Sequence, residues 1–210
     1  MKWSAENAGW KPTRRSVLLT ALSLWIGPTL RAAPAENDLM DQNDQEFGRL
    51  APNAPAALSR FAFLIGRWRC EARIKSADGE WHRFEAAWVG RFILDGYAIA
   101  DEYRMTGSSG ELIVLGMNFR TYDATRKSWN IKWLSALTGA WTDLVSEELG
   151  GIRFEGQSII YVFKEPMAGH AYTRATYTNH STTHFTWQGD KSDDGKTWSE
   201  FMVVECRRSR

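Results

Sequence analysis

The sequence predicts an all-β domain, an antiparallel up-and-down β-barrel of about ten strands. Two observations predict it: from Trp68 onward apolar and polar side chains alternate with a period of two, and turn-forming pairs separate the alternating segments. This period is typical of strands with one buried face, because successive side chains of a strand point to opposite faces. Closure into a barrel removes the exposed edges that such a long meander would otherwise carry.

The expected strands follow one another along the chain at residues 67–75, 81–92, 97–106, 112–122, 128–134, 141–147, 151–156, 159–164, 171–178, 183–191 and 197–207. The pairs that favour tight turns between them are Asp78-Gly79, Asp95-Gly96, Ser109-Gly110, Gly150-Gly151 and Asp194-Gly195.

The start of the chain has the features of a signal peptide. Arg14 and Arg15 stand directly before an apolar run that is shorter than the roughly 20 residues of a membrane-spanning helix. Residues 33–35 then offer a small-residue cleavage site. The paired arginines resemble the bacterial twin-arginine signal. We therefore expect residues 1–35 to be a cleaved leader and the mature protein to reside in the periplasm or outside the cell, without stable membrane insertion.

Charge narrows the classes of partner. The formal net charge is +1, and the basic residues gather in the expected leader, so the remaining body is mildly acidic. Such a body lacks the basic surface that nucleic-acid binding requires. Residues 36–57 are polar and rich in Pro and Ala, which predicts a flexible arm. The barrel domain is then expected over residues 58–210.

Several blocks of sequence resemble a known family. The blocks are residues 63–68 with their Gly-x-Trp, 115–123, 129–133 and 192–198. Together they resemble the lipocalin-like (calycin) barrels, and in particular a bacterial family of unknown function, domain of unknown function 1579. The resemblance covers residues 60–208 and implies a barrel whose cavity takes a small, mostly apolar molecule. It also implies that Arg207 or Arg208 packs over the indole of Trp68.

Aromatic residues and a few polar ones mark the candidate ligand site. Aromatic residues make up 13% of the chain, with 11 Trp, which suits an interior that packs tightly or grips a flat ligand. Asp101 shares one face of its strand with Tyr103, whereas Glu102 shares the other with Arg104, so either face would bring a carboxylate inside. The candidate ligand-binding residues are Tyr97, Asp101, Tyr103, Arg120, Trp129, Trp133, His184 and Trp187.

The chemistry expected of these residues differs. A carboxylate in an apolar cavity can act as a general acid or base, and Arg120 could anchor a ligand carboxylate through two hydrogen bonds. Neither CxxC nor HExxH occurs among the cysteines and histidines, so no metal and no cofactor are expected. A single axial histidine can hold haem, and His184 would be the candidate for that role.

Cys70 and Cys206 are the two cysteines of the chain. They lie near the start of the first expected strand and the end of the last one, and these strands are neighbours in a closed antiparallel barrel. An oxidising compartment would permit a disulfide between them. The alternative is two buried, unpaired thiols.

Three functional hypotheses follow. The first is an exported barrel that binds a small hydrophobic or aromatic molecule. The second is a lyase, isomerase or hydratase that uses an internal carboxylate. The third is an envelope structural or interaction module with a solid core, which the absence of a cavity of roughly 300 Å³ or more would favour. The sequence leaves the oligomeric state open.

Overall fold

The computed structural model describes residues 45–165 and 169–209, and strands make up most of them. In chain order the elements are η1 (Ala56–Leu64), β1 (Gly66–Lys75), β2 (Trp81–Ile93), η2 (Leu94–Gly96), β3 (Ala98–Thr106), β4 (Leu112–Asp123), β5 (Ser128–Ser135), β6 (Trp141–Asp143), η3 (Glu147–Leu149), β7 (Ile152–Glu155), β8 (Ser158–Lys164), β9 (Tyr172–Thr178), β10 (His184–Ser192) and β11 (Ser199–Arg208), where η marks a 3-10 helix. The predicted all-β class is confirmed. The strand expected over residues 141–147 is shorter, because Leu144 turns into the core and the chain then enters η3.

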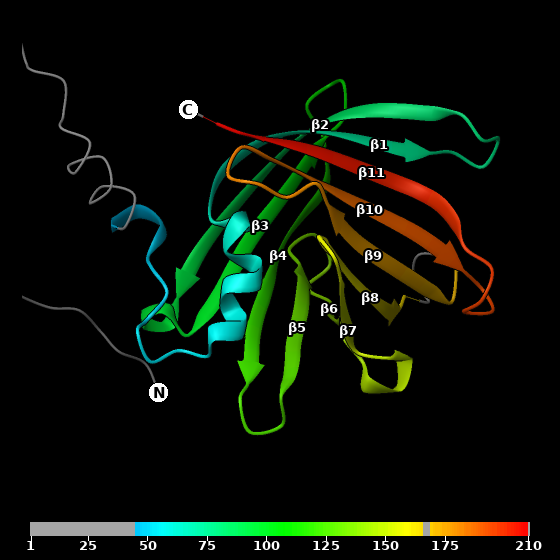
Figure 1. Ribbon diagram of the computed structural model, residues 1–210. Helices are drawn as coiled ribbons and strands as arrows, with labels where there is room; N and C mark the ends of the chain where they lie inside the picture. Colours follow the sequence, from blue (N-terminus) through cyan, green and yellow to red (C-terminus); the bar gives the residue numbers. More distant parts are fainter. Residues whose placement is uncertain (1–44, 166–168, 210) are drawn as a thin grey trace, which may run out of the picture. The chain divides into compact units, whose positions relative to one another are not determined.

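The strands form one antiparallel sheet of 11 strands in the order β6-β5-β4-β3-β2-β1-β11-β10-β9-β8-β7. The sheet curls strongly, and β11 lies between β1 and β10 (Figure 1). The predicted pairing of the first and last strands is therefore confirmed. The two edges of the sheet are β6 and β7, so the barrel stays open along a seam in the middle of the chain. No helix among the described residues is both long enough and apolar enough to cross a membrane.

Strand β1 shows how the alternation sets burial. Trp68, Cys70 and Ala72 face the interior and are buried, whereas the charged side chains between them are exposed. The same rule orients the other strands, since inward residues lie opposite inward residues across each pair. The register of each strand pair therefore keeps the inward-facing residues of all the strands on one continuous interior surface.

The turn between β10 and β11 shows why the chain reverses where the sequence predicts. One carboxylate oxygen of Asp194 accepts hydrogen bonds from the backbone N–H groups of Lys196 at 2.8 Å and Thr197 at 2.7 Å. The hydroxyl of Ser192 donates to the same oxygen at 2.9 Å. These bonds hold the pKa of Asp194 well below its usual range. Gly195 follows with a φ of +70°, a conformation that glycine adopts readily.

Helix η1 closes one end of the barrel interior. Its side chains Leu58, Phe61 and Leu64 have no exposed surface. The ring of Phe61 packs edge-on against Trp129 of β5, with centroids 5.0 Å apart, and against Tyr177 of β9 at 6.0 Å. Because β5 and β9 belong to opposite halves of the sheet, this one helix ties the two halves together at that end.

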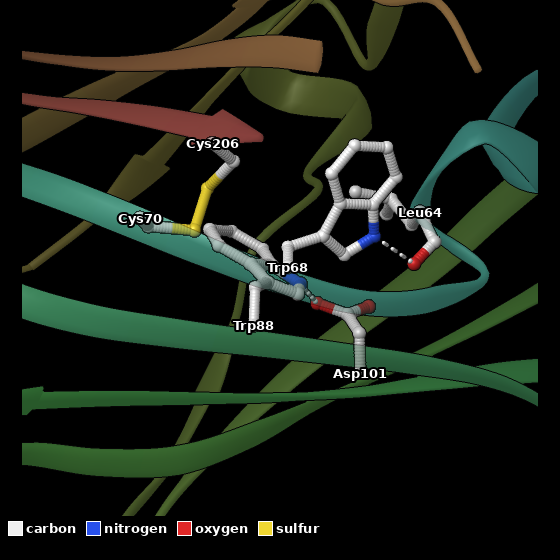
Figure 2. Close-up of a disulfide and its surroundings, with 6 residues drawn as sticks. All are labelled: Leu64, Trp68, Cys70, Trp88, Asp101 and Cys206. Atoms are coloured by element: carbon white, nitrogen blue, oxygen red, sulfur yellow. Dashed lines mark hydrogen bonds between the residues drawn. A yellow bond between two sulfur atoms is a disulfide. The ribbon is translucent and has the colours of Figure 1, made fainter. Parts of the chain in front are cut away.

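Next to η1, Trp68 is fixed on two sides. Its indole N–H donates to the carbonyl of Leu64 at 2.9 Å (Figure 2). The guanidinium of Arg208 lies 4.2 Å above the ring, and its Nη1 donates to the carbonyl of Ile65 at 2.8 Å. This is the arrangement that the lipocalin resemblance implies, with Arg208 rather than Arg207 over the indole.

Cys70 and Cys206 lie directly opposite each other on β1 and β11. In the structure they are joined by a disulfide that faces the barrel interior, close to Trp68 and Trp88 (Figure 2). The bond links two residues that are 136 positions apart in the sequence. It therefore cross-links β1 and β11, the first and the last strand of the chain.

Part of the segment expected to be a flexible arm lies within the described residues, and there it contacts the barrel. Glu46 forms an ion pair with Arg67, whose guanidinium also lies 5.7 Å from the ring of Phe47. The backbone N–H of Ala51 donates to the carbonyl of Gly96 at 3.3 Å. The expected leader over residues 1–35 lies outside the described residues.

Candidate functional site

The concave face of the curved sheet holds a partly open cavity of about 230 Å³. Side chains from β2 to β6 and from β8 to β11 line it, and eight of the 17 lining side chains are aromatic. Three of these aromatic residues are tryptophans, namely Trp88, Trp133 and Trp187. The interior of the barrel is therefore hollow, and its walls are mostly apolar and rich in aromatic side chains.

The volume limits what the cavity can hold. Pockets for drug-sized ligands span about 300–1,000 Å³, whereas an apolar cavity of about 150 Å³ is enough for benzene. A cavity of about 230 Å³ thus suits a molecule of one or two rings. It is too small for a porphyrin.

Two inward-facing glycines give the cavity its shape. A Cβ atom at Gly116 of β4 would lie 2.2 Å from Cζ2 of Trp133, and one at Gly189 of β10 would lie 2.7 Å from Cη2 of Trp187. The edges of the two indole rings therefore occupy the space where these side chains are missing. A larger residue at Gly116 would also overlap the backbone carbonyl of Leu134, 2.4 Å from the Cβ position, so either the indole or the strand would have to shift. Sequence reasoning missed both glycines, although a glycine inside a strand often marks a close approach of this kind.

A buried polar network centred on Asp101 lies directly behind the cavity wall. Its Oδ1 accepts hydrogen bonds from the indole Nε1 of Trp88 at 2.8 Å and from Nδ2 of Asn118 at 2.9 Å. Arg120 donates to the other oxygen, Oδ2, and also donates from Nη2 to the hydroxyl of Tyr177 at 2.8 Å. The register produces this meeting, since Asp101 on β3 lies opposite Asn118 on β4. Figure 2 shows the bond between Trp88 and Asp101.

Neither Asp101 nor Arg120 has exposed surface, and neither lines the cavity. The residues that they hold, Trp88, Asn118 and Tyr177, do line it. Both carboxylate oxygens of Asp101 are engaged by donors within the network. To bind a ligand carboxylate, Arg120 would have to leave a buried ion pair, and breaking such a pair costs about 3–5 kcal/mol. Asp101 and Arg120 are therefore placed to position the side chains of the cavity wall.

Tyr103 is a polar lining residue whose hydroxyl lacks a partner. Its side chain is 5% exposed and packs against the ring of Trp88, with centroids 5.1 Å apart. No described residue forms a hydrogen bond with the hydroxyl. A buried polar group without a partner costs about 1–3 kcal/mol, so it requires an explanation. Burial also raises the pKa of Tyr103, which keeps the hydroxyl protonated.

Glu165 and Thr173 form a polar part of the cavity lining that the sequence did not reveal. The hydroxyl of Thr173 donates to Oε2 of Glu165 at 2.6 Å, and Nε2 of His170 lies 2.7 Å from the same hydroxyl. Glu165 is the charged residue among the lining residues that the structure describes. Its position after the last residue of β8 gave no sign of an inward direction.

The structure separates the other sequence candidates into three groups. Trp133 and Trp187 line the cavity together with Tyr103. Trp129 is buried beside Phe61 in the packed end of the barrel. Tyr97 and His184 are exposed and lie away from the cavity lining. Within the described part of the chain, no group of three or more His, Cys, Asp or Glu side chains is placed to hold a metal ion.

Comparisons with known proteins bear on the fold. No model of a protein family matches the chain, and no curated relative matches its sequence. The crystal structure of Rv2717c from M. tuberculosis is similar over 75% of this chain and 100% of its own, at 10% identity and a TM-score of 0.52. That similarity supports a lipocalin-like barrel fold.

Two further structures are more distant. The S-type phycobiliprotein lyase CPES from Guillardia theta matches over 74% of this chain and 94% of its own, with 11% identity and a TM-score of 0.49. A redesigned β-barrel bound to DFHBI, mFAP0, matches over 70% of this chain and 99% of its own, with 15% identity and a TM-score of 0.35.

Proposed function

We propose that the protein binds a small hydrophobic or aromatic molecule in its cavity. The observation that carries this proposal is the hydroxyl of Tyr103, which lies without a partner among aromatic walls. Ligand cavities typically combine such apolar walls with a few polar groups that fix orientation. A ligand that accepts a hydrogen bond would remove the penalty of the buried hydroxyl.

The solid-core alternative draws support from volume alone, because about 230 Å³ is below the roughly 300 Å³ typical of ligand pockets. A purely structural core, however, gains nothing from Tyr103, since phenylalanine would fill the same space without an unpaired donor.

The enzyme alternative requires an internal carboxylate that can reach a substrate, and the carboxylate that the sequence singled out on the inner face does not meet this requirement. Both oxygens of Asp101 are occupied by Trp88, Asn118 and Arg120. The carboxylate in the cavity lining is that of Glu165, so this alternative would rest on Glu165. Glu102 faces away from the cavity, opposite Asp101 on the strand.

The proposal is tested by filling the cavity. Native mass spectrometry of protein purified from its own host should detect a bound small molecule of constant mass. Ala175→Phe places a ring inside the cavity and should abolish that mass, whereas Thr176→Phe, on the opposite face of the same strand, should retain it.

Thermal melts of the variants show whether each one folds. A wild-type protein that carries no small molecule and also fails to bind added naphthalene derivatives would overturn the proposal. Equal retention by the folded Ala175→Phe variant would place the ligand outside the cavity and would overturn it as well.

We further propose that the chain is exported by the twin-arginine route and acts in the periplasm or outside the cell. The paired arginines, the apolar run and the small-residue site support this proposal. The disulfide is compatible with an oxidising compartment. The same sequence blocks, together with Arg208 over Trp68, support membership of the lipocalin-like family with domain of unknown function 1579.

A further inference from the structure

We infer that the cavity selects a neutral, flat aromatic molecule that carries a hydrogen-bond acceptor, and that the hydroxyl of Tyr103 binds this acceptor. The inference rests on the proposed function and names the chemical class of its ligand. It follows from three features of the cavity: an unpaired donor, the charge of the lining and the shape of the walls.

The donor comes first. Tyr103 lies nine-tenths or more buried, lines the cavity, and has no hydrogen-bond partner for its hydroxyl among the described residues. Asn118, the next inward residue after Gly116 on β4, uses one of its two Nδ2 hydrogens on Asp101, which leaves its second N–H as a further neutral donor in the lining. The hydroxyl oxygen of Tyr103 itself has almost no exposed surface, so neighbouring side chains must adjust when a ligand binds. A carbonyl or similar acceptor on a bound ring would then complete the hydrogen bonding of Tyr103. A hydrocarbon of the same size would leave it incomplete.

The charge of the lining argues for a neutral ligand. The guanidinium of Arg120 is paired with Asp101 and does not reach the cavity, so it offers no counter-charge to a bound anion. The charged lining residue is Glu165, which would repel an anion. A buried carboxylate without a partner carries a large desolvation penalty. A quaternary ammonium would suit aromatic walls, but it cannot accept the hydrogen bond of Tyr103.

The walls argue for a flat ligand. Trp133 and Trp187 line the cavity, and the edges of their indole rings contact the sheet at Gly116 and Gly189. The space left between the walls is about 230 Å³. A one- or two-ring molecule fits this volume and can stack on an indole.

A matched series of naphthalene probes tests the inference. The probes are 2-acetylnaphthalene, 2-ethylnaphthalene, 2-naphthoate and (2-naphthylmethyl)trimethylammonium, and isothermal titration calorimetry measures their affinities at neutral pH. The ketone should bind the wild-type protein about three- to tenfold more tightly than the ethyl compound, which is the range of one neutral hydrogen bond. The naphthoate and the ammonium compound should both bind more weakly than the ketone.

Tyr103→Phe should abolish the preference for the ketone over the ethyl compound, and Tyr97→Phe, an exposed tyrosine away from the cavity, should retain it. The carbonyl stretch of the bound ketone should shift to lower frequency in the wild type and not in Tyr103→Phe. Without ligand, Tyr103→Phe should melt at the same temperature or higher, because it removes an unpaired buried group.

The outcomes separate this inference from the proposed function. Equal affinities for the ketone and the ethyl compound, unchanged by Tyr103→Phe, would overturn the inference and leave binding in the cavity intact. Tightest binding of the ammonium compound or the naphthoate would also overturn it. Failure of all four probes to bind the wild type would overturn both.

Discussion

The guanidinium of Arg120 and the carboxylate of Asp101 form an ion pair in which neither side chain has any exposed surface. The pair joins β4 to β3, and its remaining hydrogen bonds reach Trp88, Asn118 and Tyr177 in the cavity wall. Two charges that do not touch the cavity therefore set the positions of three side chains that do.

Breaking this pair from one side should be strongly destabilising. Arg120→Met leaves the carboxylate of Asp101 buried without its counter-charge, and Asp101→Asn does the same to Arg120, so each should lower the free energy of unfolding by about 3–5 kcal/mol. The double variant should lose less than the sum of the two losses, since it leaves no unpaired charge. Urea denaturation of the four proteins completes the cycle. Losses that add to within about 0.5 kcal/mol would contradict the coupling.

The disulfide between Cys70 and Cys206 should contribute strongly to stability, because it closes a loop of 136 residues. The chain-entropy model gives about 4–5 kcal/mol for such a loop, as an upper value. The variant with Cys70→Ser and Cys206→Ser should therefore unfold at lower denaturant concentration than the oxidised wild type. Thiol labelling of denatured, unreduced protein should find no reactive thiol, and two labelled thiols per chain would contradict the bond.

Trp68 should be among the most sensitive positions of the barrel. It is 2% exposed and is held by Leu64 and Arg208, so Trp68→Ala should cost about 3–5 kcal/mol in denaturant unfolding. Arg69→Ala, at the outward position next to it on β1, serves as the control and should change stability by about 0.5 kcal/mol or less. A loss below about 1 kcal/mol for Trp68→Ala would contradict the burial of the indole.

Stability should fall at alkaline pH for a defined reason. Burial raises the pKa of Tyr103 and of Tyr177 above the usual value of 10.0. The folded state therefore keeps both hydroxyls protonated, while in the unfolded chain they ionise near pH 10. The stabilisation from this difference is complete below about pH 10 and is lost as the pH rises further. Phenolate absorbance from these two residues should appear together with the loss of circular dichroism, and Tyr103→Phe should reduce its amplitude. Phenolate formation by Tyr103 in a protein that is still folded would contradict this prediction.

Export should depend on the paired arginines. Substituting Arg14→Lys together with Arg15→Lys should keep the protein in the cytoplasm, because the twin-arginine route reads that pair. Cleavage after Ala35 should leave Glu36 as the first residue of the exported form. N-terminal sequencing of the periplasmic fraction checks both outcomes, and an intact Met1 in that fraction would contradict cleavage.

The sequence predicts the strands well because each strand reports its own inner face locally, as Trp68, Cys70 and Ala72 do in β1. The neighbourhood of the first and last strands is also confirmed, although the sheet does not close fully and leaves β6 and β7 as edges. The orientation of β3 does not follow from the sequence. One face of the strand carries Asp101 and the other carries Glu102. Asp101 faces inward because Trp88 of β2 and Arg120 of β4 form hydrogen bonds with it, and these contacts depend on the register of three strands.

The composition of the cavity wall follows from the sequence only in part, since the candidates Tyr103, Trp133 and Trp187 line it and the others do not. Arg120 reads as a ligand anchor in the sequence, and only its non-local partner Asp101 shows that its charge is already used. Gly116 and Gly189 lack a side chain and thereby make room for an indole. At Gly116 the indole is that of Trp133 on the neighbouring strand, and at Gly189 it is that of Trp187 on the same strand. Such roles depend on three-dimensional packing, which a period of two does not encode.

The order of the sheet has a consequence for how the chain folds. Strands β1 to β6 and β7 to β11 form two meanders in which each strand pairs with its neighbour in sequence, and β1 with β11 is the junction between them. Each meander can form through short loops, which close at low entropic cost, whereas the junction must bring together residues more than a hundred positions apart. Pairing across such distances is slow in folding. We therefore expect the pairing of β1 with β11 to form late in folding, and oxidation of Cys70 and Cys206 would then cross-link that junction.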